Sequence, residues 1–144
     1  MSALRLSRSR KPKQGGSGSL PRILVVDDDV ESADSLAAAL QSAGYGEARV
    51  AYSGATALTL AGAFLPTVLL VDLDLPDMSG HDVARLLSQH PKLPNLRMIA
   101  LTASSEHPGR ELAREAGMER YLSKPVDPAA LEELFTLNGP GTRS

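Results

Sequence analysis

Short apolar runs recur along the chain, and four of them end at a polar or charged residue. Ile23 to Val26 runs into Asp27-Asp28, Val68 to Val71 into Asp72, Met98 to Leu101 into Thr102, and Tyr121 to Ser123 into Lys124-Pro125. A fifth run extends from Ala48 to Tyr52. Short, bounded runs rich in Val, Ile and Leu are typical of strands buried on both faces of a parallel sheet. The pattern therefore predicts five strands.

Stretches with helical periodicity separate these runs. In the first, apolar residues fall at i, i+3, i+4, i+7 and i+10, namely Ala33, Leu36, Ala37, Leu40 and Ala43. Asp29 is expected to cap this helix, and Gly44 to end it. Further helices are expected from Ser53 to before Pro66, over 81–89, and from Asp127 to about Leu137. Another is expected after the Thr102 strand, through Leu112, Ala113 and Ala116, with Gly117 ending it. Five βα units predict a doubly wound α/β domain with right-handed crossovers.

The two ends of the chain differ from this domain, which we place at residues 21–137. Residues 1–20 are polar and basic and end in a Gly/Ser-rich stretch, so they are expected to form a flexible tail or linker. Residues 1–22 hold six basic and no acidic residues, which leaves a net charge of −8 on the remainder. The tail could bind anionic lipid or nucleic acid, although it has no aromatic residue for base stacking; a solvated tether is the alternative. Residues 138–144 are expected to be a C-terminal tail.

Composition narrows the class of protein. The 144 residues are one domain's worth of length, with no room for a DNA-binding output domain. The absence of Cys excludes a disulfide framework and a thiolate metal site. No apolar stretch approaches the roughly 18 residues of a membrane span, and the N-terminus lacks the apolar core of a signal peptide. We therefore expect a cytoplasmic protein.

The charged residues that end the strands are the candidate site. In an open parallel sheet, ligands sit outside the carboxyl ends of the strands, and in a flavodoxin-like order, 2-1-3-4-5, the first and third strands are neighbours. Asp27, Asp28 and Asp72 would then lie together. Carboxylates about 4 Å apart repel by about 4 kcal/mol at an effective dielectric near 20, so the cluster calls for a cation. Oxygen ligands without His or Cys favour Mg²⁺.

Three further residues at or near strand ends are, taken one at a time, weaker evidence for a phosphoryl site. Lys124 offers the positive charge that a phosphoryl group needs, and its position before Pro125 allows a cis peptide bond, although Lys-Pro commonly marks an ordinary turn. Thr at a strand end, as at Thr102, is commonly explained by β-propensity. Tyr121 fits half-buried packing. Their meaning comes from their combination.

Taken together, these residues resemble the response-regulator receiver domain of two-component signalling. The matching stretches are 23–28 (Ile-Leu-Val-Val-Asp-Asp), 72–80 (Asp-Leu-Asp-Leu-Pro-Asp-Met-Ser-Gly), 100–103 (Ala-Leu-Thr-Ala) and 121–125 (Tyr-Leu-Ser-Lys-Pro). All four stand in register over about residues 21–137. Asp74 and Ser104 depart from the commonest family sequences.

The resemblance implies a role for each residue. Asp72 would accept a phosphoryl group from a histidine kinase, a phosphotransfer protein or a small acyl phosphate. Asp28, Asp72 and the backbone carbonyl of Asp74 would bind Mg²⁺ directly, and Asp27 would act through water. Lys124 would pair with the phosphoryl oxygens, while Thr102 and Tyr121 would switch a partner-binding surface after Thr102. Such a domain catalyses only its own phosphorylation and dephosphorylation.

Two other functions fit parts of the pattern. Asp72-Leu73-Asp74 resembles the Asp-x-Asp of haloacid-dehalogenase phosphatases, but those enzymes carry their other acidic metal ligands downstream, whereas here the acidic pair lies upstream. A pseudo-receiver, which binds partners without phosphorylation, is the second alternative. The complete set of acids, Thr and Lys argues against it.

Overall fold

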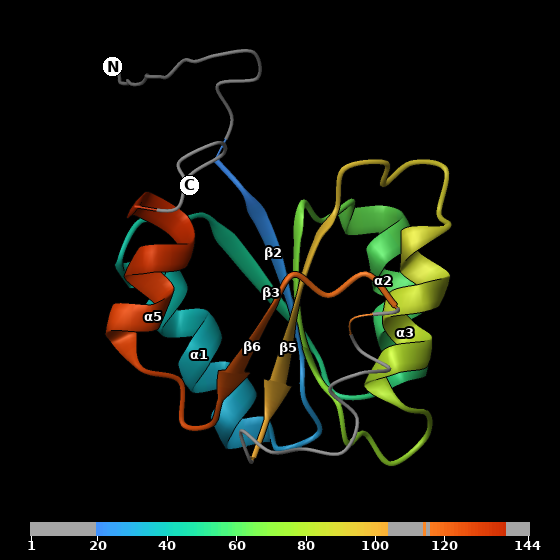
Figure 1. Cartoon of the computed structure of the whole chain (residues 1–144), viewed down its shortest axis with the longest axis horizontal. Coiled ribbons are helices and arrows are strands. Elements are labelled where there is room, and N and C mark those ends of the chain that lie inside the picture. The colour runs from blue at the N-terminus through green and yellow to red at the C-terminus, as the bar shows by residue number, and fades with distance from the viewer. Residues whose placement is uncertain (1–19, 104–113, 115, 138–144) are drawn as a thin grey trace, which may run out of the picture.

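The computed structural model describes residues 20–103, 114 and 116–137, which form a parallel sheet covered on both faces by helices (Figure 1). The strands are β2 (Arg22–Val26), β3 (Glu47–Ala51), β4 (Val68–Asp72), β5 (Arg97–Thr102) and β6 (Arg120–Ser123). Their order in the sheet is β3-β2-β4-β5-β6, and every pair is parallel. This is the order 2-1-3-4-5, so the predicted flavodoxin-like fold is confirmed.

The helices divide between the two faces (Figure 1). α1 (Val30–Ser42) and α5 (Pro128–Glu132), which continues into the π-helical η1 (Glu133–Leu137), cover one face. α2 (Gly54–Phe64) and α3 (Gly80–Ser88) cover the other. Within the described residues, no helix combines the length and the apolar character that a membrane crossing requires.

Each strand contributes alternate residues to the two layers of core. On β2, Ile23 and Val25 pack with residues of α1 and α5, whereas Leu24 and Val26 pack with residues of α2 and α3. All four are fully buried. Burial on both faces explains why β2, β4 and β5 read as continuous apolar runs rather than as an alternating pattern.

The ends of the helices follow the capping residues. The side chains of Asp29, Ser53 and Asp127 accept hydrogen bonds from backbone N–H groups in the first turns of α1, α2 and α5. These bonds satisfy donors that have no partner within the helix. The predicted capping role of Asp29 and the predicted start of α2 after Ser53 are therefore confirmed.

Some boundaries differ from the sequence prediction. The second strand begins and ends one residue earlier than expected, and Tyr52, which follows it, is exposed. The last helix is not uniform: it widens at Glu133 into η1, where Leu134 is buried and the ring of Phe135 stacks on Tyr45 with 5.1 Å between centroids. The helix expected between Thr102 and Gly117 lies almost wholly outside the described residues, as do the two tails.

Candidate functional site

The register of the sheet brings the predicted site residues to one edge. Val26 of β2 pairs with Val71 of β4, so Asp27 and Asp72 leave adjacent strands at the same level. Asp72 in turn pairs with Leu101, the residue before Thr102. Asp27, Asp28 and Asp72 each offer a carboxylate oxygen, and these three oxygens lie within 4.8 Å of one another. The predicted acidic cluster therefore exists in the structure.

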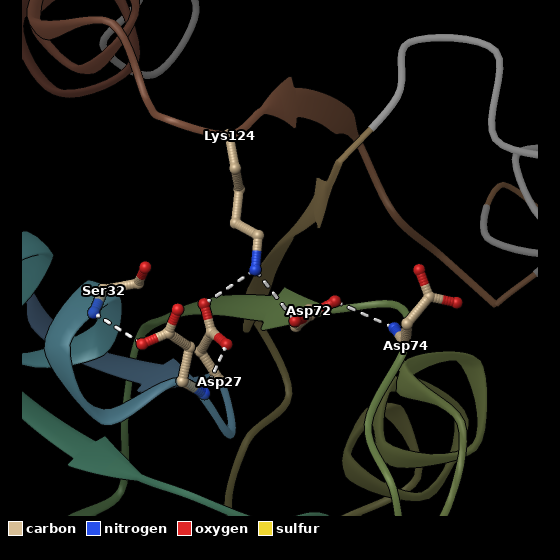
Figure 2. A network of polar contacts seen from close by, with 6 residues as sticks. Asp27, Ser32, Asp72, Asp74 and Lys124 are labelled. Carbon is tan, nitrogen blue, oxygen red and sulfur yellow. Dashed lines mark hydrogen bonds and ion pairs between the residues drawn. The ribbon is translucent and has the colours of Figure 1, made fainter.

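Lys124 reaches this cluster from the end of β6. Its Nζ donates to Oδ2 of Asp27 and to Oδ2 of Asp72, at 3.0 Å in both cases (Figure 2). Its backbone N–H donates to the carbonyl of Thr102, which fixes the residue beside β5. The Lys124–Pro125 peptide bond is cis, the isomer that the sequence allowed. One ammonium group thus bridges two carboxylates from different strands.

The second oxygen of each bridged carboxylate accepts a backbone hydrogen bond. Oδ1 of Asp27 accepts from the N–H of Asp29 at 3.0 Å. Oδ1 of Asp72 accepts from the N–H of Asp74 at 2.8 Å (Figure 2). The two arrangements are alike, and each one holds its carboxylate with one edge toward its own loop and the other toward Lys124.

Burial makes these charges depend on one another. Asp27 is 2% exposed and Asp72 5%, whereas Asp28 is exposed. Burial by itself lowers the pKa of Lys124, but the hydrogen bonds and negative charges of Asp72 and Asp27 outweigh this effect and raise the pKa above its ordinary value. Lys124 therefore stays charged and offsets one of the three negative charges.

The two predicted switch residues lie on β5 and β6, which follow β4, the strand of Asp72, in the order of the sheet. Thr102 ends β5, is fully buried and pairs with Ser123 across to β6. Tyr121 pairs with Ala100 and is partly buried against the core on the α2/α3 face. Thr102 therefore lies one residue beyond the level of Asp72 on the neighbouring strand, and Tyr121 lies two residues before the level of Thr102 on β6.

The donor set of the cluster fits a magnesium ion. Three carboxylates from two adjacent loops offer hard oxygen ligands, and the site contains no His or Cys. Mg²⁺ binds oxygen at about 2.0–2.1 Å, so two ligands on opposite sides of the ion are about 4 Å apart. Because the three oxygens already lie within 4.8 Å, small side-chain rotations would bring them into reach.

A cavity of about 510 Å³ adjoins the cluster between α1 and the β6–α5 connection. Asp27 and Lys124 are among its lining residues, together with polar residues that include Glu31 and Ser35 and apolar residues that include Leu36 and Leu131. The cluster is therefore reachable from the α1/α5 side.

One residue of the loop that carries Asp74 was not singled out from the sequence. Asp77, in the loop between β4 and α3, accepts hydrogen bonds from the N–H groups of Gly54 and Ala55 at the start of α2. A helix cap supplied by a residue more than twenty positions away has no local sequence pattern. Only the position of Asp77 in a strand-end loop was visible in the sequence.

Comparison with known proteins supports the same class of protein. The family model of the response regulator receiver domain matches residues 23–136. An uncharacterized 14.6 kDa protein of Leptolyngbya boryana is 38% identical over 112 residues, which cover 78% of this chain and 85% of that protein. The response regulator PleD of Caulobacter vibrioides is 36% identical over 110 residues, which cover 76% of this chain but only 24% of PleD.

One solved structure with a similar fold is described with a metal ion in its own site. The receiver domain of the sensor histidine kinase PA1611 from Pseudomonas aeruginosa has a TM-score of 0.72 and 29% identity, over 81% of this chain and 95% of that one. That structure is described with a magnesium ion coordinated in its active-site cleft.

The fold and the acidic edge define a doubly wound α/β domain with a charged site at the carboxyl ends of its strands. The chain belongs to the family of response-regulator receiver domains of two-component systems. The resemblance stated from the sequence is thereby confirmed.

Proposed function

We propose that this chain is a phosphorylation-dependent receiver in which Asp72 accepts the phosphoryl group and Mg²⁺ binds beside it. The observation that carries the proposal is the pair of hydrogen bonds from Lys124 Nζ to Asp27 and Asp72 within the acidic cluster. These bonds bring the buried carboxylate of Asp72, which would be the nucleophile, together with the ammonium group of Lys124 and the other carboxylates at one edge of the sheet.

The chemical step needs few groups. A carboxylate oxygen of Asp72 attacks the phosphorus of a phosphohistidine or of a small acyl phosphate. The bond from phosphorus to the imidazole nitrogen or to the acyl oxygen breaks, and the leaving group keeps the electron pair. The product is an aspartyl phosphate, and water later hydrolyses it and restores the carboxylate. The chain thus catalyses its own phosphorylation and dephosphorylation, and the phosphoryl donor is the substrate that it consumes.

The residues around Asp72 would have two electrostatic roles, namely to bind Mg²⁺ and to pair with the phosphoryl oxygens. Asp28, Asp72 and the backbone carbonyl of Asp74 would hold Mg²⁺ directly and Asp27 through water; when bound, the ion supplies positive charge against the phosphoryl oxygens. Lys124 would release Asp72 and pair with the phosphoryl oxygens on the other side.

Phosphorylation would then change the conformation of residues on β5 and β6. A phosphoryl group adds nearly two negative charges, and the Thr102 hydroxyl would move toward them. Tyr121, on the neighbouring strand, would follow into the space behind Thr102. The surface that changes would bind the downstream partner, and a histidine kinase or a phosphotransfer protein would supply the phosphoryl group.

A turnover measurement tests this proposal against its rivals. The protein is incubated with acetyl phosphate and Mg²⁺, while both covalent label and free phosphate are followed against a reaction without protein. A receiver acquires at most one alkali-labile phosphoryl group per chain, which Asp72→Ala abolishes. In a parallel incubation with a phosphate monoester, a haloacid-dehalogenase phosphatase would release free phosphate, and in the acetyl phosphate incubation a pseudo-receiver would acquire no label; either result would contradict the proposal.

A further inference from the structure

The loop that joins β4 to α3, residues 73–79, starts at Asp72 and carries Asp74. Two hydrogen bonds hold its base: the N–H of Asp74 donates to the side-chain Oδ1 of Asp72 at 2.8 Å, and the N–H of Gly80 donates to the carbonyl of Leu73 at 3.2 Å. Gly80 is pressed against the strand end, since a Cβ there would lie 2.4 Å from the carbonyl oxygen of Asp72. These contacts hold the base of the loop against the end of β4.

The far part of the loop is held from outside, by α2. Both oxygens of Asp77 are used: Oδ1 accepts from the N–H of Gly54 at 2.9 Å, and Oδ2 accepts from the N–H of Ala55 at 3.0 Å. These N–H groups belong to the first turn of α2 and have no partner within the helix. The carboxylate also lies at the positive end of the helix dipole. Asp77 thus links the loop to α2.

Packing keeps the same two segments in close contact. Gly54 is buried, and a Cβ added to it would lie 2.3 Å from Cγ of Met78, the residue after Asp77. The side chain of Ser53 caps α2 as well, but it does so from within the helix by accepting from the N–H of Thr56 at 3.1 Å. α2 therefore has one cap of its own and one that comes from the loop of the site.

We propose that Asp77 is a positioning residue for the Mg²⁺ site, which holds the β4–α3 loop in the conformation that presents Asp74 beside Asp72. This inference rests on the proposed function, because it assigns Asp77 to the Mg²⁺ site proposed there. Asp77 does not bind the ion. It acts through the loop, whose base is held at the end of β4 and whose far part is held by α2.

The expected effect on Mg²⁺ affinity depends on the fraction of time that the loop spends in its binding-competent conformation. When a loop adopts its binding-competent conformation for only part of the time, the apparent dissociation constant rises by the inverse of that fraction. Loss of both Asp77 hydrogen bonds would free the far part of the loop and leave Asp74 held mainly by the bond from its N–H to Oδ1 of Asp72, which is itself a proposed Mg²⁺ ligand. Mg²⁺ should then bind more weakly although every proposed ligand is still present.

The experiment compares Mg²⁺ affinity in four forms of the full chain: wild type, Asp77→Ala, Asp77→Asn and Ser53→Ala. The chain has no Trp, so binding is followed by amide NMR shifts during MgCl₂ titration, well below the melting temperature. We expect Asp77→Ala to weaken Mg²⁺ binding about tenfold, at the lower end of the effect of groups that orient metal ligands. Asp77→Asn, whose single amide oxygen can replace one of the two bonds, should lie between Asp77→Ala and wild type.

Ser53→Ala is the matched control, because it removes a cap from the same helix but leaves the loop attached. It should lower the melting temperature and keep the wild-type Mg²⁺ affinity. Equal loss of affinity in Ser53→Ala and Asp77→Ala would overturn the proposal, since Asp77 would then act only through helix stability. Wild-type affinity in Asp77→Ala would also overturn it. Should Asp77→Ala not fold, Asp77→Asn against Ser53→Ala decides in the same way. Failure of wild type to bind Mg²⁺ would instead refute the proposed function, and this inference with it.

Discussion

Removal of the Asp28 side chain should change the stability of the protein in opposite directions with and without Mg²⁺. Asp28 is exposed, and its carboxylate lies within 4.8 Å of oxygens of Asp27 and Asp72. Lys124 bonds to the other two acids and offsets one of their charges. Asp28 therefore faces a net charge of about −1. At this distance one unit charge is worth about 3.5 kcal/mol at a dielectric of 20 and about 0.9 kcal/mol in water.

Because Asp28 is exposed, the lower value applies, and salt reduces it further. Asp28→Ala should thus be stabilised by up to about 1 kcal/mol in chelator, or about 3–5 °C in melting temperature for a domain of this size. Wild type should gain about 2.7 kcal/mol in Mg²⁺ at a hundred times the dissociation constant. The two melting temperatures should cross when Mg²⁺ reaches about four times that constant.

Thermal unfolding in chelator and across a MgCl₂ series measures both effects. Glu47→Ala is the control, because Glu47 is an exposed acid at the start of β3 whose partner, Arg49, is also exposed. It should change little, as exposed ion pairs usually do, and should gain as much from Mg²⁺ as wild type. Melting of Asp28→Ala well below wild type in chelator would show that this carboxylate is structural. An equal Mg²⁺ gain in Asp28→Ala would show that it is not a ligand.

Three further predictions concern the switch, the cation and the loop. Thr102→Ala should still be phosphorylated on Asp72, but beryllofluoride should shift the amide NMR resonances of β6 and α5 less than in wild type. Lys124→Met leaves two buried carboxylates without their cation, so it should lose about 3 kcal/mol of stability in chelator, the lower end of the range for a broken buried pair because Lys124 is partly exposed, and yet bind Mg²⁺ more tightly. Hydrogen bonds from the N–H groups of Gly54 and Ala55 lower the pKa of Asp77 below 3.8, so its contribution is present above that pH and is lost as the pH falls through the folded-state pKa. The difference in melting temperature between wild type and Asp77→Asn should shrink accordingly in acid.

Each of these predictions has a contrary result. Beryllofluoride shifts confined to the loops around Asp72 and Lys124, in wild type itself, would leave Thr102 without a switching role. Weaker Mg²⁺ binding in Lys124→Met would mean that the ammonium group organises the carboxylates rather than competes with the ion. A stability difference for Asp77→Asn that stays constant down to a pH of about 3 would show that the charge of Asp77 does not strengthen its hydrogen bonds.

The sheet was predictable because strands buried on both faces leave a strong signal. β2, β4 and β5 are continuous apolar runs that end at Asp27, Asp72 and Thr102, and parallel pairing brings such ends to one edge. Helix starts were readable where a capping side chain precedes its own helix, as at Asp29 and Ser53. In each case the information lies within a few residues of the feature it determines.

Features that depend on tertiary contact were not readable. Asp77 caps a helix that precedes it by more than twenty residues, so no spacing rule identifies it. The bridge from Lys124 to both Asp27 and Asp72 needs strands brought together across most of the domain, and the sequence indicated only that the three would share an edge. The widening of the last helix into η1 accompanies the packing of Leu134 and of Phe135 on Tyr45, which helical periodicity does not encode.

Chemical mapping of the phosphorylated residue tests the central claim most directly. The protein is phosphorylated with acetyl phosphate and Mg²⁺ and then reduced with borohydride, which converts an acyl phosphate to an alcohol and marks its position for peptide mass spectrometry. Asp27 and Asp28 share the acidic cluster with Asp72, and Asp74 lies two residues beyond Asp72, so these three are the competing aspartates. The account predicts reduction at Asp72 alone and none in Asp72→Ala. A mark on any of the other three in wild type, with Asp72 unmodified, would contradict it.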